Sequence, residues 1–166
     1  MKTFDTFVLM PFGASGEYSG GATESEYVYK EIIEPSVVEA TNRLNTGSYN
    51  DSSNIGSRPK IVREVDRSQS GSITASIVRS IAKADVVIVD ITGRNPNVFL
   101  ELGIRYALRS KVTILLAQIG TQIPFDIKVY RYIEYDHFRP AEARKQIIDA
   151  IQQGLSDDMT SDSVVV

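Results

Sequence analysis

Residues 85–103 read DVVIVDITGRNPNVFLELG, and this stretch decides the fold. Val86 to Val89 form a continuous β-branched run that is too short for a helix and apolar on both faces, as in a central parallel strand. Asp90 then lies at or near the carboxyl end of that strand. In open parallel α/β sheets this edge carries the ligand crevice, because the loops diverge there at the topological switch point. The stretch therefore predicts an α/β fold with a ligand site beside Asp90.

A helix is expected to begin directly after this turn. Asn95 can cap it with the side-chain oxygen, and Pro96 suits the first helical position, where no N–H is needed. Residues 98–108 are apolar around most of the helix circumference and are interrupted only by Glu101 and Arg105. Those two residues are four apart, so they share a face and can pair. A helix this apolar is buried by the sheet on one side and by another layer or subunit on the other.

The pattern leaves two interpretations of Glu101. In one, Glu101 and Arg105 are the narrow solvated stripe of the helix. In the other, Glu101 is a functional carboxylate one turn inside a helix whose N-terminus faces the ligand crevice. Gly103 costs roughly 1 kcal/mol relative to alanine in a helix interior, which suggests a close backbone approach at that position.

Strands and helices alternate along the rest of the chain. Strands are expected at residues 4–10, 60–63, 86–90, 111–117 and 130–135. Helices are expected at residues 23–44, where Pro35 can kink or divide the helix, and at 73–84, 96–109 and 140–155. This alternation predicts a flavodoxin-like three-layer sandwich with a five-stranded parallel sheet in the order 2-1-3-4-5.

We expect residues 1–155 to form a single domain, because 166 residues suffice for one full core but not for two. Residues 45–59 are rich in Asn, Ser, Gly and Asp, and we expect a flexible excursion there. Residues 156–166 are expected to form a disordered tail.

Composition excludes several classes of function. The net charge of -3 gives no basic footprint for a nucleic-acid polymer, whereas a small nucleotide needs only local donors. The chain has no cysteine and one histidine, which argues against thiolate catalysis, disulfides, Cys- or His-rich metal sites and a His-based triad. It has no run of 18 apolar residues and no apolar core of a signal peptide at its start. We therefore expect a cytoplasmic protein without metal, cofactor or membrane contact.

Two further segments reach the predicted crevice edge. The first strand ends at Pro11-Phe12-Gly13, which places a ring and free backbone there. The glycine-rich segment 13–21 matches neither a P-loop nor a dinucleotide fingerprint, and it is either a surface loop or a lid. Arg63 ends the second strand and Asp66 follows it, and each is either a solvated turn charge or a ligand contact.

Three islands of this sequence resemble the nucleoside 2-deoxyribosyltransferase-like proteins and, more distantly, the TIR-like NAD hydrolases. The islands are Met10 to Gly13, Arg63 to Ser72, and Ala84 to Leu108. The resemblance is close for the bacterial branch with the pattern MPFG, NPNVFxELG and PFD, the last of which lies at residues 124–126. It covers most of the chain outside residues 45–59 and the tail.

The resemblance implies roles for individual residues. Glu101 falls on the nucleophile that attacks the anomeric carbon of the sugar. Pro11 and Phe12 fall on the turn that encloses base and sugar, and Asp90 falls close to the base, where it can assist protonation. One element differs, because Asn95-Pro96-Asn97 stands where the family usually has an acidic residue, Gly and Thr.

The expected chemistry is cleavage or transfer of the (deoxy)ribosyl–base bond of a nucleoside or nucleotide. This N-glycosidase reaction passes through an oxocarbenium-like state, which a carboxylate on the far face of the sugar can stabilise or capture as an ester. A second group, Asp90 or Asp66, meets the leaving base. The remaining candidate substrate-binding residues are Gly13, Arg63, Ser70, Gly71, Asn95, Asn97 and Asp126.

Two alternatives remain open at the sequence level. A TIR-like NAD hydrolase breaks the same type of bond, whereas a non-enzymatic nucleotide-sensing module leaves its ligand intact. In each case the expected partner is a small nucleoside, nucleotide or NAD. A homo-oligomer is also expected, because the nearly all-apolar helix at 96–109 has to be covered.

Overall fold

A computed structural model of the chain describes residues 4–11, 22–46, 59–63, 73–108 and 111–156. The expected tail and all but the edges of the expected excursion at 45–59 lie outside these residues, as does the glycine-rich segment 13–21.

The sheet has five parallel strands in the order β2-β1-β3-β4-β5, which confirms the predicted flavodoxin-like topology. The strands are β1 (Asp5–Leu9), β2 (Lys60–Arg63), β3 (Val86–Asp90), β4 (Val112–Gln118) and β5 (Ile133–Tyr135). The last strand is shorter than the expected 130–135, because Tyr130 and Tyr132 pack against the core on the side of α4 instead of pairing.

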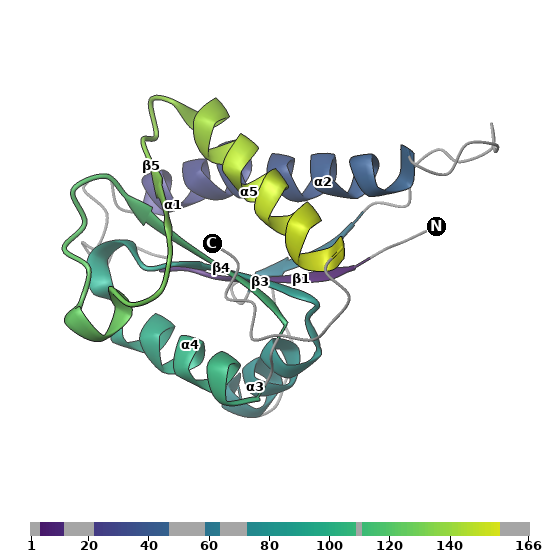
Figure 1. The fold of residues 1–166 in the computed structure, drawn as a ribbon. Coiled ribbons are helices and arrows are strands. Elements are labelled where there is room, and N and C mark those ends of the chain that lie inside the picture. Colours follow the sequence, from purple (N-terminus) through teal and green to yellow (C-terminus); the bar gives the residue numbers. More distant parts are fainter. Residues whose placement is uncertain (1–3, 12–21, 47–58, 64–72, 109–110, 157–166) are drawn as a thin grey trace.

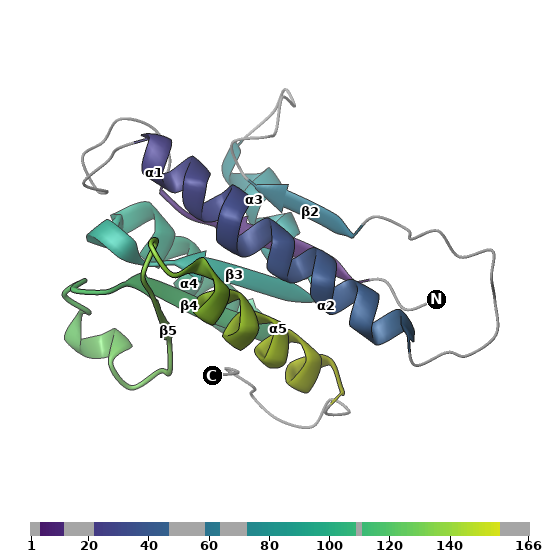
Figure 2. The ribbon, with the colours of Figure 1, turned by 90° about the horizontal axis from the view of Figure 1, so that it is seen from above.

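Helices cover both faces of the sheet (Figure 1). One layer contains α1 (Ala22–Tyr27), the π-helical segment η1 (Val28–Ile33), α2 (Glu34–Thr46) and α5 (Pro140–Ser156). The other contains α3 (Ile73–Lys83) and α4 (Pro96–Leu108), with the short 3-10 turns η3 (Thr92–Arg94) and η4 (Phe125–Ile127) near the ends of the strands. Figure 2 shows α2 and α5 side by side over the sheet.

The strand sequences account for the two core layers. Successive side chains of a strand point to opposite faces, so Val8 of β1 joins the core under α2 and α5, whereas Phe7 and Leu9 join the core above α3 and α4. All five residues of β3 are buried, as expected for a central strand with helices on both faces.

Pro35 divides the first long helix as its sequence indicates. Proline lacks the N–H that would bond the carbonyl four residues back, and its ring would clash with that carbonyl. The residues just before it adopt π-helical geometry, and the Glu34 N–H bonds to the Tyr29 carbonyl five residues back. The widened turn lets the helix continue through Pro35 into α2.

The structure corrects two expectations for α4. Glu101 is 8% exposed and Arg105 is fully buried, so the solvated-stripe interpretation of this pair is wrong. Apart from the adjacent residues and the backbone of the helix itself, no described atom lies within 4 Å of a Cβ added at Gly103, so no other described part of this chain makes the expected close approach. The outer face of α4 instead exposes Leu100 and Leu108, at 64% and 49%.

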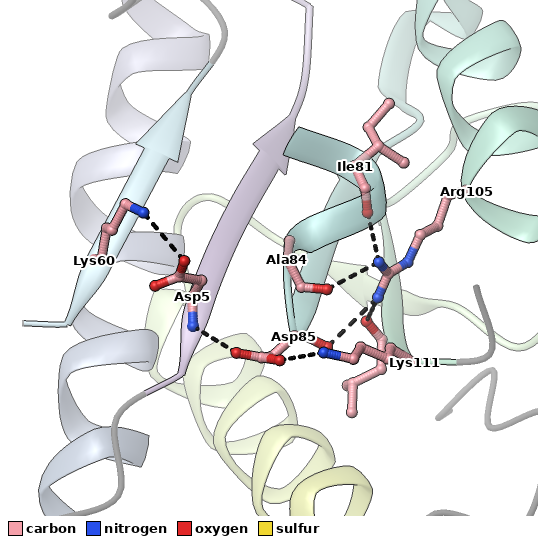
Figure 3. A network of polar contacts seen from close by, with 8 residues as sticks. Asp5, Lys60, Ile81, Ala84, Asp85, Arg105 and Lys111 are labelled. Atoms are coloured by element: carbon pink, nitrogen blue, oxygen red, sulfur yellow. Dashed lines mark hydrogen bonds and ion pairs between the residues drawn. The ribbon is translucent and has the colours of Figure 1, made fainter. Parts of the chain in front are cut away.

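The guanidinium of Arg105 joins α4 to the ends of three other elements (Figure 3). Nη1 donates to the carbonyls of Ile81 and Ala84 at 2.7 and 3.0 Å, which satisfies acceptors at the end of α3. Nη2 donates to the Val112 carbonyl at 3.1 Å and to the Asp85 carbonyl at 3.4 Å, and Nε donates to Thr113 Oγ1 at 3.1 Å. One side chain therefore fixes α4 against α3, β3 and β4.

Asp85 extends this network to the first strand. Its carboxylate accepts the Asp5 N–H at 3.0 Å and pairs with the Lys111 ammonium (Figure 3). Burial acts to raise the pKa of Asp85, but the Lys111 ammonium, the Asp5 N–H and the charge of Arg105 outweigh burial and hold the pKa below its ordinary value. Because the folded-state pKa is the lower one, this contribution to stability is present above the unfolded-state pKa and is lost as the pH falls through the folded-state pKa.

We expect Arg105→Met to lower the free energy of unfolding by about 3–5 kcal/mol, because it leaves buried carbonyls without donors. Arg105→Lys should be intermediate, since an ammonium cannot reach acceptors on both sides of the guanidinium plane. Urea denaturation monitored by circular dichroism measures both. Arg43→Met is the control, because Arg43 is exposed and its ion pair with Glu39 lies within α2. A loss no greater than that of the control would contradict the role of Arg105.

Candidate functional site

Asp90 is the last residue of β3, at the carboxyl edge of the sheet, as predicted. Its side chain is fully buried. Oδ1 accepts the backbone N–H of Thr92 at 2.9 Å, and Oδ2 accepts the hydroxyl of Tyr135 at 2.9 Å. The carboxylate therefore joins the end of β3 to the turn that follows it and to the end of β5.

Tyr135, Thr92 and Gln118 continue this network across the sheet edge. The Tyr135 hydroxyl oxygen lies 3.1 Å from Thr92 Oγ1, which accepts the Gln118 N–H at 2.9 Å. Because the Tyr135 proton is directed to Asp90, the Thr92 hydroxyl donates to the Tyr135 oxygen. The groups form a directed chain from the Gln118 amide through Thr92 and Tyr135 to Asp90.

The side chain of Gln118 belongs to a second cluster, with Glu24 and His137. Gln118 Nε2 donates to Glu24 Oε1 at 2.9 Å and lies 3.0 Å from His137 Nδ1. His137 Nδ1 lies 3.6 Å from Glu24 Oε1, and the Glu24 side chain is only 10% exposed. The Tyr27 hydroxyl donates to the His137 carbonyl at 3.0 Å. This cluster places a carboxylate and an imidazole at the same sheet edge as Asp90.

The start of α4 follows the sequence prediction. Asn95 Oδ1 accepts the N–H of Asn97 at 2.8 Å and lies 3.4 Å from the N–H of Val98, so Asn95 caps the helix and Pro96 is its first residue. Asn97 is exposed in the first turn. Two residues of the preceding turn, Gly93 and Arg94, have positive φ, at 77° and 59°. A left-handed arginine is strained, and such strain is concentrated at ligand-binding sites.

Glu101 lies on the inner side of α4, where it is buried with Val98 and Leu102. It follows Pro96 by five residues, so the rise of the helix places it about 7–8 Å from the helix start. Arg105 follows one turn later and reaches the opposite edge of the sheet. The backbone of α4 thus holds Glu101 between the candidate crevice and the buried arginine.

The other predicted site residues are placed as follows. Arg63 ends β2, where its guanidinium pairs with Glu26 at 2.7 Å and stacks 3.8 Å above the ring of Tyr29. Pro11 is buried just after β1, and Asp126 is exposed in η4. The remaining candidates, Phe12, Gly13, Asp66, Ser70 and Gly71, lie outside the described residues.

The segment that contains Asp126 is held against α4. Tyr130 stacks on Tyr106 with ring centroids 4.7 Å apart, and Ile127 packs against the same core. Burial raises the pKa of Tyr106, and the neighbouring Tyr130 adds to this effect. The 125–132 segment therefore lies beside the helix that carries Glu101.

Sequence reasoning missed four of the residues that gather at this edge: Glu24, Thr92, Gln118 and Tyr135. Gln118 and Tyr135 end β4 and β5, so the rule that parallel strands meet at one carboxyl edge could have identified them. No local signal marks Glu24, because its partner Gln118 lies 94 residues further along the chain. His137 is the single histidine of the sequence, and one of its ring nitrogens belongs to the cluster.

Comparison of the chain with known protein families finds no match, and none is found among curated proteins. Within the described ranges, no helix has the length and apolar character needed to cross a membrane. In the same part of the chain, no three His, Cys, Asp or Glu side chains are grouped so that they could hold a metal ion.

We expect Tyr135→Phe to lower the free energy of unfolding by about 1–3 kcal/mol, because it removes the donor to the buried Asp90 carboxylate. Urea denaturation measures the loss. Tyr132→Phe is a matched control, since the Tyr132 hydroxyl has no hydrogen-bond partner among the described residues. It should change stability by less than about 0.5 kcal/mol. Equal stability of the two variants would show that the hydroxyl of Tyr135 does not support Asp90.

Proposed function

We propose that this protein is an N-glycosidase that cleaves or transfers the (deoxy)ribosyl–base bond of a nucleoside or nucleotide through Glu101. The observation that carries the proposal is a carboxylate only 8% exposed, on the helix that starts at the ligand-binding edge of a parallel sheet. Burying a carboxylate costs free energy of folding, so buried carboxylates are concentrated at sites whose chemistry requires them.

The proposed reaction forms one bond at the sugar and breaks another. A carboxylate oxygen of Glu101 attacks the anomeric carbon as the bond to the base nitrogen breaks, and the electron pair of that bond leaves with the base. Water or a second base then displaces Glu101 from the glycosyl ester, which gives hydrolysis or transfer. In this second step the bond between Glu101 and the anomeric carbon breaks, and its electron pair returns to the Glu101 carboxylate.

The leaving base needs a proton, and the carboxyl edge offers two sources. Asp90 is the candidate by resemblance, but its carboxylate is fully buried and acts on its surroundings through Tyr135 and Thr92. The cluster of Glu24, Gln118 and His137 lies at the same edge and is partly exposed. We propose that Asp90 orients the side chains at the carboxyl edge. We also propose that the proton reaches the base from the cluster of Glu24, Gln118 and His137.

The turn before α4 supports a ligand site at this edge. Gly93 and Arg94 keep left-handed conformations just outside the helix, and Arg94 does so at a steric cost. The exposed side chains of Asn97 and Arg94 can donate to a phosphate or a sugar hydroxyl.

We expect the wild-type protein to release free base from at least one nucleoside, nucleoside monophosphate or NAD, and Glu101→Gln to lower that rate by at least about a thousandfold. Chromatographic separation of base from substrate measures the release. NAD as the one substrate would identify the NAD-hydrolase alternative.

The matched control is Glu39→Gln, because Glu39 is exposed on α2 and pairs with Arg43. It should retain the wild-type rate. Release by Glu101→Gln at the wild-type rate and with unchanged thermal stability would remove Glu101 from the mechanism. A wild-type protein that binds these ligands and leaves them intact would be the nucleotide-sensing module.

We also propose that the protein self-associates through the outer face of α4. Leu100 and Leu108 are exposed there two turns apart, with Gly103 and Ala107 between them and no cation or carboxylate on this stripe. The same apolar stripe on a second copy is the complement that a two-fold interface requires. The open space above Gly103 lets another helix approach the backbone closely.

We expect the wild type to be a dimer or larger in light scattering, and the double variant Leu100→Glu/Leu108→Glu to be a monomer, because two charges would be desolvated in the contact. Ile119→Glu is the control, since Ile119 is 62% exposed but lies in the loop after β4. A monomeric wild type, or a double variant that remains associated, would contradict this interface.

A further inference from the structure

A cavity of about 360 Å³ lies between α3 and the adjacent strands β1 and β2. Its polar lining consists mainly of Lys60 from β2, Asp5 from β1, and Ser76, Arg79, Ser80 and Lys83 from α3. The proposed reaction uses none of these residues.

The fold gathers these side chains for simple geometric reasons. On α3, residues 76, 79, 80 and 83 repeat at the spacing of one helix face, whereas Ile77 and Ile81 pack into the core. On β2, Lys60 and Val62 point to the α3 side, because Ile61 between them packs against the opposite core. The cavity is thus the space between an edge strand and a polar helix face.

The lining is positively charged although the chain carries a net charge of -3. Lys60, Arg79 and Lys83 contribute three positive charges, and Asp5 contributes the one negative charge. Asp5 is already paired with Lys60 at 3.1 Å (Figure 3).

Two of the cations have donors to spare. Arg79 uses Nε for the Ala75 carbonyl at 3.2 Å, and its terminal nitrogens have no partner among the described residues. Within the same residues, Lys83 has no hydrogen bond or ion pair. Among the described residues, the cavity therefore offers an excess of positive charge and N–H donors without a partner. Ser76 and Ser80 also line it, and the Ser80 hydroxyl donates to the Ser76 carbonyl at 3.1 Å.

The helix dipole alone does not explain this cluster. A lysine in the last turn of a helix is favourable, and Lys83 stands there. Arg79 lies one turn earlier, and Lys60 belongs to a strand. Convergence of the three on one cavity from two elements is what an anion site requires.

The cavity is separate from the proposed catalytic site. Asp5 and Lys60 are the first residues of β1 and β2 and are paired in register, and Lys83 just precedes β3. These positions mark the amino edge of the sheet, whereas Asp90, Gln118 and Tyr135 mark the carboxyl edge. A ligand in the cavity would not compete with a substrate at Asp90.

We propose that this cavity binds a small phosphate-bearing anion, with Arg79 and Lys83 as its main ligands. An arginine fork and a lysine charge are the usual partners of phosphate oxygens. The volume lies at the lower end of the range of small-molecule pockets, so the ligand is a phosphate or a short phosphate ester. The proposal does not depend on the N-glycosidase reaction.

Isothermal titration calorimetry of the full chain at constant ionic strength tests the proposal, with inorganic phosphate and glycerol 3-phosphate as the ligands. We expect saturable binding of at least one of them to the wild type. The double variant Arg79→Gln/Lys83→Gln should weaken it by roughly tenfold or more, because it removes both charges with free donors. Tighter binding of the ester would indicate that the site also contacts the attached group, whereas equal binding would indicate recognition of phosphate alone.

The control is the double variant Lys30→Gln/Arg43→Gln. It also removes one lysine and one arginine charge, but from exposed ion pairs in the opposite helical layer. It should keep the wild-type affinity to within about twofold, since exposed charges at a distance are screened. Circular dichroism and the urea midpoint establish that the variants fold, and the single variant Lys83→Gln serves if the double one does not. No saturable binding by the wild type, or equal weakening in both double variants, would overturn the proposal.

Discussion

The structure depends on the buried guanidinium of Arg105. Its N–H groups donate to four backbone carbonyls and one hydroxyl, which belong to the end of α3 and to the starts of β3 and β4. Burying a cation costs several kcal/mol unless its donors are satisfied, and here the acceptors are ones that helix and strand ends would otherwise leave to water. The arginine therefore allows the end of α3 and the starts of β3 and β4 to be buried together, and it fixes the C-terminal part of α4.

The two edges of the sheet carry different tasks. At the amino edge, Asp85, Lys111 and Arg105 form contacts that hold strands and helices together. At the carboxyl edge, Asp90 and Tyr135 tie the strand ends, and Gln118 connects them to the first helix through Glu24. A parallel sheet places every strand end of one kind on one side, so a fold of this type can stabilise itself at one edge and arrange chemistry at the other.

Much of the fold was predictable because it is encoded locally. The apolar run of β3 and the Asn95-Pro96 helix start each act within a few residues, and both were found where the sequence predicts them. The strand order followed from the alternation of elements and the handedness of crossovers. The fifth strand was placed less well, because Tyr130 and Tyr132 are apolar enough for a strand but pack against the core on the side of α4.

The site was only partly predictable, and the reason is sequence distance. Periodicity gave Glu101 and Arg105 a common helix face, but it cannot tell that Arg105 bonds to Ile81 and Ala84, which precede it by 24 and 21 residues. From the sequence alone, a solvated stripe on the helix surface therefore explains Glu101 and Arg105 as well as a buried functional pair does. The Gln118 contact with Glu24 spans 94 residues and has no counterpart in any local pattern. Contacts of this kind arise only when the sheet brings its strand ends together.

Anchoring α4 at its far end has a consequence for Glu101. A group on a helix is positioned more closely than one on a loop, provided that the helix itself cannot slide. Arg105 prevents sliding from one turn beyond Glu101, and the Asn95 cap fixes the start of the same helix. Glu101 is thus held between two fixed points, and the turn at Gly93 and Arg94, with its positive φ angles, lies outside the part of the helix that they fix. The fold therefore fixes the position of the Glu101 carboxylate relative to the carboxyl edge of the sheet.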